Sequence, residues 1–281
     1  MEVGAIAYLG PVGTYSELAA KAYMQQFVGR SLDLIPYPTI PQTIRSVVAG
    51  GHGLAIVPAE NSIQGSVTMT LDTIWELEGL HILQAVDLPI QNALVTNLQD
   101  LDQVERVYSH PQPLAQCQNW LDTYLTRAMQ VATNSTVEGL ELLKTDPTGA
   151  AIASVTAAQL YQIPVLACPI NDHPENYTRF WVLGLGQSSQ VGSHTSIAFS
   201  VRQNLPGALV TPLAVFATRG INLSRIESRP TKRSLGDYIF FIDLEAGLHE
   251  SRMQEAIAAL EGLTEQLKIL GSYQITPLGT Y

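Results

Sequence analysis

The chain has 281 residues, 46% of them apolar, which suits two domains with a sizeable core. Its formal net charge is −10, and the acidic excess is confined to the part through Gly192, with 7 Lys and Arg against 17 Asp and Glu, compared with 8 against 8 beyond. This charge disfavours nucleic acid and anionic membranes as partners. No apolar run approaches the roughly 18 residues of a membrane span, and Met1-Glu2-Val3 lacks a targeting pattern, so we expect a soluble, cytoplasmic protein.

Short apolar runs alternate with helical segments from Gly4 to about Ser62. We predict strands over Ile6–Leu9, Leu32–Tyr37 and Leu54–Val57, and helices over Thr14–Phe27 and Ile40–Ala49. This alternation is typical of a mostly parallel sheet covered by helices. Thr14 and Glu17 predict a capping box at the first helix. The glycines before that helix match neither a dinucleotide nor a Walker fingerprint, which argues against nucleotide binding.

A second α/β unit is predicted from about Ile82 to Ala167. Its strand candidates are Ala93–Val95, Val104–Tyr108, Gln130–Ala132, Ala150–Ala153 and Val165–Ala167, with helices between them. The chain then returns through Asn171–Arg179, and the apolar strand that follows is expected to rejoin the first unit. Two lobes connected in this way leave a cleft lined by strand ends and helix starts. We place lobe one at about 1–81 and 172–187, and lobe two at about 82–171.

The polar stretch Gln187–Ser193 suits a linker, which we place at 188–194. Beyond the linker, residues 195–281 are expected to form a separate domain. In it we predict strands over Ser196–Val201, Ile221–Ser228, Tyr238–Leu244 and Leu267–Ile275, and helices over Pro206–Thr218 and Glu250–Leu263. This βαββαβ order is ferredoxin-like. Pro206 fits the first position of a helix, and Gly220 fits its end.

The cysteines and histidines suggest no metal chemistry. Cys117 and Cys168 are far apart in sequence and lie in helical or apolar contexts, so both are predicted to be reduced, structural thiols. The 6 histidines show no paired ligand spacing. Neither residue type therefore predicts a metal site.

Six segments together carry a family resemblance. They are Gly10-Pro11-Val12-Gly13-Thr14-Tyr15-Ser16, Pro58-Ala59-Glu60-Asn61-Ser62, Ser109-His110-Pro111-Gln112, Asn134-Ser135-Thr136, Asn176-Tyr177-Thr178-Arg179-Phe180 and Glu227-Ser228-Arg229-Pro230. In this order they resemble prephenate dehydratase over essentially the whole chain. The resemblance implies an α/β fold with a two-lobed catalytic domain, like that of periplasmic binding proteins, and a carboxy-terminal ACT domain. The chain begins at the family's first strand, so we expect the monofunctional enzyme without a fused mutase.

The family's reaction removes a ring hydroxyl and a ring carboxylate from prephenate together, giving phenylpyruvate, carbon dioxide and water. The resemblance thus implies a carbon–oxygen lyase, specifically a hydro-lyase, of phenylalanine biosynthesis that requires neither a metal nor an organic cofactor. Aromatisation drives the reaction, so the enzyme must hold the pyruvyl carboxylate, place a donor near the leaving hydroxyl and keep water from stabilising the departing carboxylate. In an acidic domain, the carboxylates must be bound by helix starts and a few placed cations.

The resemblance assigns site residues one by one. The catalytic candidates are Thr178, Glu60, Asn61, Ser109 and Gln116, and the substrate-binding candidates are Thr14, Ser62, Ser135, Thr136, Arg179 and Phe180. Thr178 is expected to donate a hydrogen bond to the departing hydroxyl, because its own acidity is too weak for a bare proton transfer.

Several of these residues also have ordinary structural roles. Glu60 suits an acid if burial raises its pKa, but it also fits a solvated side chain. Arg179 suits either a substrate carboxylate or a structural ion pair, and strand alternation places it on the face opposite Thr178. Asn61, Ser62, Ser135 and Thr136 also suit helix capping. His110 is assigned to the turn before Pro111 and left out of the catalytic set.

The carboxy-terminal domain is expected to bind phenylalanine as an allosteric effector. By resemblance, its site is formed across a subunit contact by Gly207, Ala208, Leu209, Asn222, Glu227, Ser228, Arg229 and Pro230. A shared site of this kind requires at least a homodimer, and a homotetramer is also compatible with it.

Two other functions fit parts of the pattern. Arogenate dehydratase performs the same elimination on an amino-bearing substrate, and the motifs do not separate it from prephenate dehydratase. A non-catalytic two-lobed binding protein with a sensing domain belongs to another class. Thr178, together with the other polar segments, favours the enzyme, because simple capture needs only carboxylate ligands.

Overall fold

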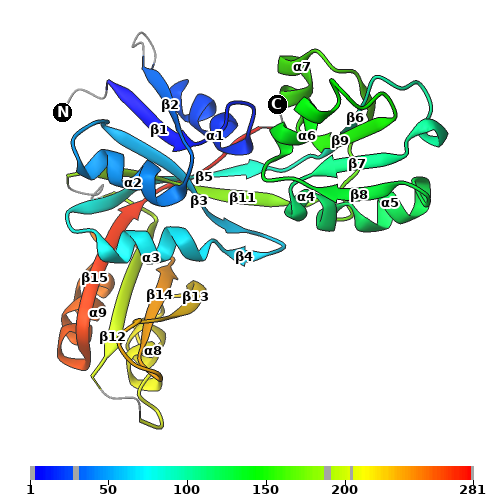
Figure 1. The fold of residues 1–281 in the computed structure, drawn as a ribbon. Helices are drawn as coiled ribbons and strands as arrows, with labels where there is room; N and C mark the ends of the chain where they lie inside the picture. The colour runs from blue at the N-terminus through cyan, green and yellow to red at the C-terminus, as the bar shows by residue number, and fades with distance from the viewer. Residues whose placement is uncertain (1–3, 28–31, 187–190, 203–204, 280–281) are drawn as a thin grey trace.

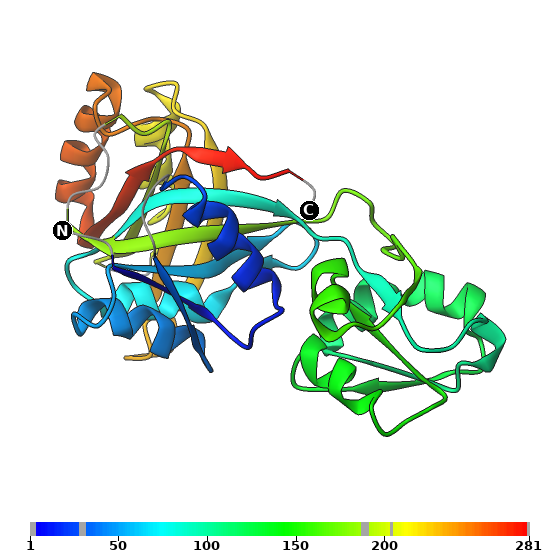
Figure 2. The same ribbon diagram turned by 90° about the horizontal axis from the view of Figure 1, so that it is seen from above.

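The computed structural model describes residues 4–27, 32–186, 191–202 and 205–279. They form two lobes and a carboxy-terminal domain that packs against the first lobe (Figures 1 and 2). The two-lobed α/β architecture is therefore as predicted. Within the predicted linker, residues 187–190 lie outside the described part of the chain.

Lobe one is built on a sheet with the strand order β16-β5-β11-β3-β1-β2, to which β4 adds by pairing with β3. Its strands are β1 (Ala5–Leu9), β2 (Asp33–Tyr37), β3 (Leu54–Asn61), β4 (Gly65–Ser66), β5 (Leu80–Pro89), β11 (Tyr177–Leu185) and β16 (Ile275–Pro277), and its helices are α1 (Tyr15–Met24), α2 (Ile40–Val48) and α3 (Thr68–Glu76). The apolar side chains of α1 cover one face of this sheet. Helices α2 and α3 and the carboxy-terminal sheet cover the other face.

A variant of the predicted capping box forms at the start of α1, in which Glu17 binds the amide of Gly13 instead of that of the N-cap Thr14. The Glu17 amide donates to Thr14 Oγ1 at 3.4 Å, and the Glu17 carboxylate accepts the amide of Gly13 at 2.7 Å. Glu17 thus ties down the turn that leads into the helix. The predicted strands and helices of this lobe are confirmed, with ends shifted by a few residues.

Lobe two has a five-stranded sheet of order β10-β6-β9-β7-β8. Its strands are β6 (Ala93–Val95), β7 (Arg106–Ser109), β8 (Met129–Ala132), β9 (Gly149–Ala153) and β10 (Val165–Ala167), and its helices are η1 (Leu101–Gln103), α4 (Pro111–Gln116), α5 (Gln118–Tyr124), α6 (Thr136–Leu142) and α7 (Val155–Tyr161). The predicted lobe boundary at about residue 82 is wrong. β5 pairs with β11 from Leu80 to Pro89, so the chain leaves lobe one only after that strand.

The carboxy-terminal domain has the strand order β13-β14-β12-β15 with two helices on one face. Its elements are β12 (His194–Val201), α8 (Val210–Ala217), β13 (Leu223–Pro230), β14 (Tyr238–Leu244), α9 (Ser251–Leu263) and β15 (Thr264–Tyr273). Two predictions need correction. Helix α8 begins at Val210 rather than Pro206, because Gly207 has a positive φ of 84° in the turn before it. After β15, the chain rejoins the sheet of lobe one as β16, beside β5.

A β-bulge in β3 decides which side chains face the cleft. Thr178 pairs with Asn61 and Arg179 with Glu60, but Phe180 pairs with Pro58, so Ala59 is an extra residue in β3. Strict alternation from Leu54 would place Glu60 on the face of Pro58 and Asn61 on the opposite face. The bulge reverses this assignment, as bulges near functional sites often do.

The two cysteines differ in environment. Cys117 is buried and Cys168 is exposed, and both are free thiols. A structural role in the core therefore fits Cys117, which packs in the core of lobe two, but not the exposed Cys168. Among the described residues, no helix is long and apolar enough to cross a membrane.

The second lobe contains a charged cluster that should make its stability depend on pH. Arg106 donates to both oxygens of Asp146 at 2.7 and 3.0 Å, and Tyr108 donates its hydroxyl to the same carboxylate at 2.8 Å. These bonds, with the Arg106 guanidinium as the largest cause, hold the pKa of Asp146 well below its usual range.

Asp146→Asn should lower the free energy of unfolding by about 2 kcal/mol at pH 7, the scale of hydrogen bonds to a charged group. Because the folded-state pKa is depressed, this stabilisation is complete above the unfolded pKa of about 3.9 and is lost as pH falls below it. Urea unfolding at pH 7 and below pH 4 measures the difference, with the exposed Asp102→Asn as control. An equal difference at both pH values would contradict this assignment.

Candidate active site

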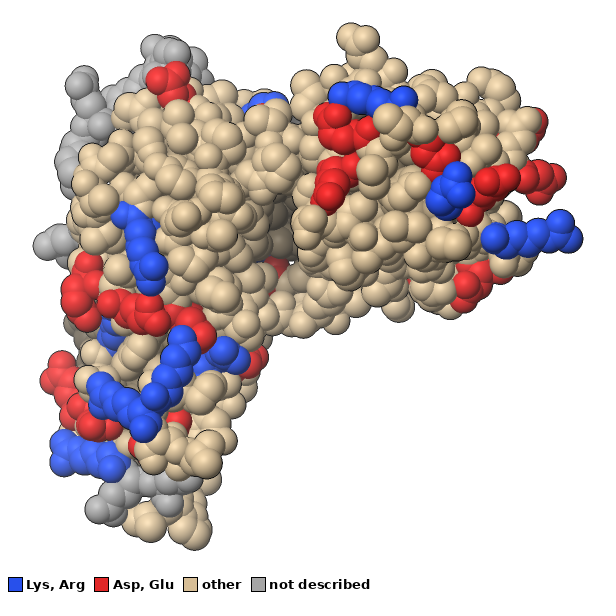
Figure 3. Space-filling view, viewed as in Figure 1, with Lys and Arg blue, Asp and Glu red and all other residues tan. Residues whose placement is uncertain are grey.

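A cleft of about 900 Å³ lies between the two lobes, in the hollow visible in Figure 3. Seven of the predicted site residues line it: Thr14, Asn61, Gln116, Ser135, Thr136, Thr178 and Phe180. They come from both lobes, from the start of α1, the ends of β3 and β11, and helices α4 and α6. The cleft therefore brings together segments that are far apart in the sequence.

Asn61 and Thr178 form the centre of this site. Asn61 Nδ2 donates to Thr178 Oγ1 at 3.0 Å, while its Oδ1 accepts the amides of Ile63 and Gln64, each at 3.1 Å. Since the Thr178 oxygen accepts this bond, its own O–H can donate into the cleft. Both side chains are more than nine-tenths buried, so their geometry is fixed by the fold.

A chain of buried amides connects this pair to the second lobe. Asn61 Nδ2 also donates to Asn176 Oδ1 at 2.8 Å, and Asn176 Nδ2 donates to Gln116 Oε1 at 3.1 Å. Asn92 approaches the same Gln116 oxygen at 3.5 Å, and the Tyr15 hydroxyl lies 3.1 Å from the Asn92 oxygen. Asn176, Asn92 and Gln116 are each almost completely buried. This row of hydrogen-bonded amides crosses the two segments that join the lobes.

Gln116 has a donor left over. Its Nε2 is buried and has no hydrogen-bond partner among the described residues. The amide orientation is fixed because its oxygen faces the Asn176 amino group, so exchanging the two atoms would bring two donors together. A buried donor of this kind costs about 1–3 kcal/mol unless something binds it, and Gln116 lines the cleft.

The described residues that line the cleft carry no formal charge. Among the described lining residues there is no Lys, Arg, Asp or Glu. Polar contacts come instead from hydroxyls, side-chain amides and the first turn of α1, where the amides of Tyr15 and Ser16 have no acceptor within the helix. The cleft therefore lacks, in its described lining, the cations that were expected to bind the substrate carboxylates. The helix start that was expected to bind them is present.

His110 lines the cleft, although the sequence suggested only a turn residue. Its Nδ1 accepts the amide of Gln112 at 3.2 Å, so in the neutral ring the proton lies on Nε2. Burial lowers the pKa of His110, which favours this neutral form. Tyr15 and Asn176 lie in two of the segments that carry the resemblance but were not assigned to the site, and Asn92 was not singled out, because no sequence pattern shows that these three side chains meet in the folded chain.

Glu60 and Arg179 do not face the cleft, so their predicted placement there is wrong. Arg179 makes an ion pair with both oxygens of Asp87, at 2.8 Å each, as its structural alternative anticipated. Glu60 lies on the same face of the sheet, which is the face that contacts the carboxy-terminal domain. Burial raises the pKa of Glu60, and the charge of Arg225 opposes this shift. The raised pKa expected of a catalytic acid is therefore present, but on the face that contacts the ACT domain and not in the cleft.

Ser109 and Ser62 also lie outside the cleft lining and serve the backbone. Ser109 is fully buried and donates to the carbonyl of Ile152 at 2.8 Å, joining β7 to β9. Ser62 is exposed, and its Oγ accepts the amide of Tyr177 at 3.0 Å. Ser135 keeps both of its possible roles, since it lines the cleft and caps α6 by accepting the Glu138 amide at 3.1 Å.

The predicted effector residues lie in the carboxy-terminal domain and are largely exposed. Gly207, Asn222 and Ser228 are exposed in the single chain, and β13 is an edge strand. Arg229 is instead bonded to Asp72 of α3 at 3.0 and 3.1 Å. Ala208 and Leu209 lie half-buried just before α8, and Glu227 and Pro230 lie on β13.

Comparisons with known proteins agree on one family. Residues 6–188 match the family model "Prephenate dehydratase", and residues 195–262 match "ACT domain". The prephenate dehydratase of Lactococcus lactis subsp. cremoris is 36% identical over 282 residues, covering 98% of this chain and 99% of that protein. The bifunctional chorismate mutase/prephenate dehydratase of Aquifex aeolicus is 39% identical over 269 residues, covering 95% of this chain and 73% of that protein.

A solved prephenate dehydratase leads to the same conclusion. The prephenate dehydratase of Arthrobacter aurescens in complex with L-Phe has a TM-score of 0.87 and 35% identity, and the match covers 96% of this chain and 90% of that one. The likeness spans both lobes and the carboxy-terminal domain. The chain therefore belongs to the prephenate dehydratase family and carries an ACT domain at its carboxyl end.

Proposed function

We propose that the cleft between the lobes is where this chain carries out its family's reaction, the decarboxylative dehydration of prephenate to phenylpyruvate. The observation that carries the proposal is the Asn61–Thr178 hydrogen bond, which leaves a buried hydroxyl free to donate into an uncharged cleft. In this reaction, the bond to the ring carboxylate breaks, its electron pair aromatises the ring, and the ring hydroxyl leaves as water after taking up a proton. The activity is that of a carbon–oxygen lyase.

Thr178 stabilises the departing hydroxyl by a hydrogen bond that strengthens as negative charge develops on that oxygen. The bond from Asn61 polarises the Thr178 hydroxyl and so makes it a better donor. Gln116 Nε2 and His110 Nε2 supply further N–H donors for the oxygens of the substrate. The proton that converts the departing hydroxyl to water is relayed to it from the solvent.

The uncharged lining suits the loss of carbon dioxide. A carboxylate that is well solvated or ion-paired holds its charge, which raises the barrier to decarboxylation. Placing Arg179 and Glu60 on the opposite face keeps both charges away from this carboxylate. The pyruvyl carboxylate, which must be held, fits the first turn of α1 beside Thr14.

We infer that the ACT domain binds phenylalanine at a contact between two copies of the chain. The related structure from Arthrobacter aurescens contains L-Phe. In the single chain, Asn222 and Ser228 are exposed beside an edge strand, which pairing with a second copy would cover. The proposed assembly is a homodimer or a homotetramer of such dimers.

Thr178→Val, which keeps the side-chain shape and removes the hydroxyl, should lower kcat for prephenate a hundredfold or more, the scale of a lost transition-state donor. Thr178→Ser should retain most of the activity. Phenylpyruvate absorbance in base measures turnover, with arogenate assayed beside prephenate and melting temperature as the control for folding. A loss of less than tenfold in Thr178→Val would rule out this role, and faster turnover of arogenate would assign the other substrate.

Asn176→Ala removes the amide that bridges Asn61 and Gln116, so kcat for prephenate should fall about tenfold or more, because catalytic groups that lose their positioning act less well. The exposed Asn119→Ala in α5 is the matched control and should not change turnover. Wild-type turnover by a folded Asn176→Ala would show that the amide chain is only structural.

Asn222→Ala should weaken phenylalanine binding about tenfold, because it removes a polar group from the shared site. Titration calorimetry measures the affinity, and sedimentation velocity measures whether binding accompanies a dimer. Unchanged affinity, or full binding by a monomer, would place the effector elsewhere.

A further inference from the structure

The edge strand β13 of the ACT domain has two faces with different neighbours. Arg225, Glu227 and Arg229 alternate along the face toward lobe one, and Arg225 is only 8% exposed. Ile226 and Ser228 lie on the other face and are exposed. The same strand therefore contacts the catalytic domain on one face and is open on the other.

Arg225 reaches from the ACT domain into the catalytic domain. Its guanidinium donates to both oxygens of Asp243 at 2.8 and 3.1 Å, and its Nη1 donates to Ser66 Oγ at 3.2 Å. The guanidinium also lies 5.1 Å from the centre of the Trp181 ring, a cation–π contact with β11. Such a planar, buried and paired guanidinium has little freedom to move, so it fixes the position of Ser66.

Ser66 belongs to the short hairpin that carries Asn61. Across β3 and β4, Ser66 pairs with Glu60 and Gly65 pairs with Asn61. The turn between them is built around the Asn61 side chain, whose oxygen accepts the amides of Ile63 and Gln64. One side of the hairpin thus holds Thr178, and the other side is held by Arg225.

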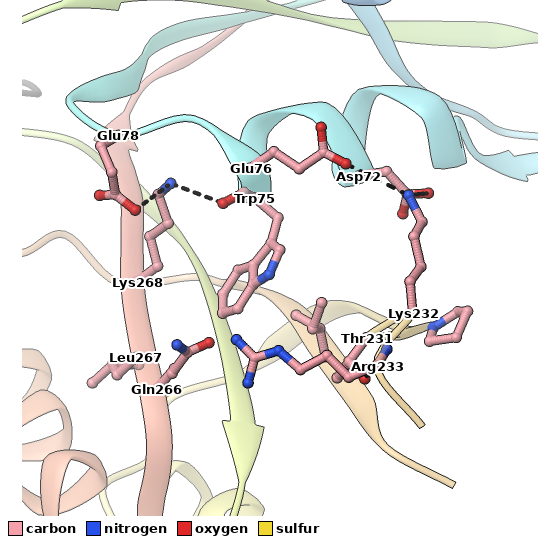
Figure 4. A pocket seen from close by; sticks show the side chains of 12 residues that line it. Asp72, Trp75, Glu76, Glu78, Thr231, Lys232, Arg233, Gln266, Leu267 and Lys268 are labelled. Atoms are coloured by element: carbon pink, nitrogen blue, oxygen red, sulfur yellow. Dashed lines mark hydrogen bonds and ion pairs between the residues drawn. The ribbon is translucent and has the colours of Figure 1, made fainter. Parts of the chain in front are cut away.

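The segment after the hairpin is bound to the ACT domain as well. Arg229 and Lys232 form ion pairs with Asp72 of α3. Lys268 of β15 donates to three carbonyls at the end of this helix, those of Ile74, Trp75 and Leu77. Figure 4 shows Lys232 and Lys268 reaching α3 across a cavity of about 540 Å³. Lys and Arg lie among Asp and Glu where α3 meets the ACT domain in Figure 3. Residues from β4 to the end of α3 are therefore fixed to the ACT domain at both ends.

We propose that Arg225 is a positioning residue for the dehydration site: through Ser66 it fixes the β3–β4 hairpin, and thereby the Asn61 amide that orients Thr178. The inference rests on the proposed function of the cleft and extends it to the ACT domain. It also gives an effector a route to the site, because a ligand that shifts β13 from its open face shifts Arg225 on the other face.

The test is a double-mutant cycle between Ser66 and Asn61. Ser66→Ala removes one half-buried hydroxyl, so the fold should be retained. It should lower kcat for prephenate about fivefold and change KM less than twofold. In an Asn61→Ala background the same substitution should have no further effect, because the group through which it acts is absent. Equal losses in both backgrounds, or no loss at all, would overturn the proposal.

Arg225 is tested in the same assay. Arg225→Met combined with Asp243→Asn avoids leaving a buried carboxylate unpaired and should lower kcat about tenfold, whereas Arg225→Lys should recover part of the loss. Arg252→Met, on the partly exposed Arg252 of α9, is the matched control. A lower melting temperature with unchanged kcat would mean that the Arg225–Asp243 pair is only structural.

Hydrogen exchange, which needs no substrate, tests the contact between Arg225 and the hairpin independently of the reaction assigned to the cleft. The amides of Ile63 and Gln64 should exchange their hydrogens about tenfold faster in Ser66→Ala and in the Arg225 variants than in the wild type. If the wild type fails to convert prephenate but exchange accelerates, the proposed function is wrong and the hairpin contact stands. Unchanged exchange rates would refute the contact itself.

Discussion

One extra residue in β3 determines how this molecule divides its side chains between catalysis and domain packing. The bulge at Ala59 directs Asn61 toward the cleft and Glu60 toward the ACT domain, and β11 matches this by directing Thr178 and Arg179 to the same two faces. The hydrogen bond between Asn61 and Thr178 exists only because of this register. Without the bulge, the Glu60 carboxylate would face the cleft and the Asn61 amide would lie among the charged side chains at the contact with the ACT domain.

As a consequence, the charged side chains of β3 and β11 lie on the opposite face of the sheet from the dehydration site. Two ion pairs lie where lobe one meets the ACT domain: Arg179 of β11 binds Asp87 of β5, and Arg225 binds Asp243 within the ACT domain. The described lining of the cleft is uncharged. A leaving carboxylate is weakly held in such surroundings, whereas hydroxyl and amide donors still stabilise the hydroxyl that leaves from the other end of the ring. The same separation puts the charged face where a regulatory domain makes contact with the catalytic strands.

The sequence was sufficient for most of the fold because its apolar runs have clear periods and turn residues punctuate them. Thr178 and Asn61 were found by resemblance, and both line the cleft. The placement of Glu60 failed because a bulge leaves no mark in a pattern of alternation. The lobe boundary failed because β5 pairs with a strand almost a hundred positions away in the sequence. The buried roles of Asn92 and Asn176 depend on two crossing segments that meet only in the folded chain.

Catalysis at this site requires Asn61 and Thr178 to act as one unit, and a double-mutant cycle on kcat for prephenate measures this directly. Asn61→Ala, Thr178→Ala and the double variant are compared with the wild type under saturating substrate. If the two residues form one donor, the double variant should lose about as much activity as Thr178→Ala alone. A loss equal to the product of the two single losses would show that they act independently, and the central role given to their hydrogen bond would be wrong.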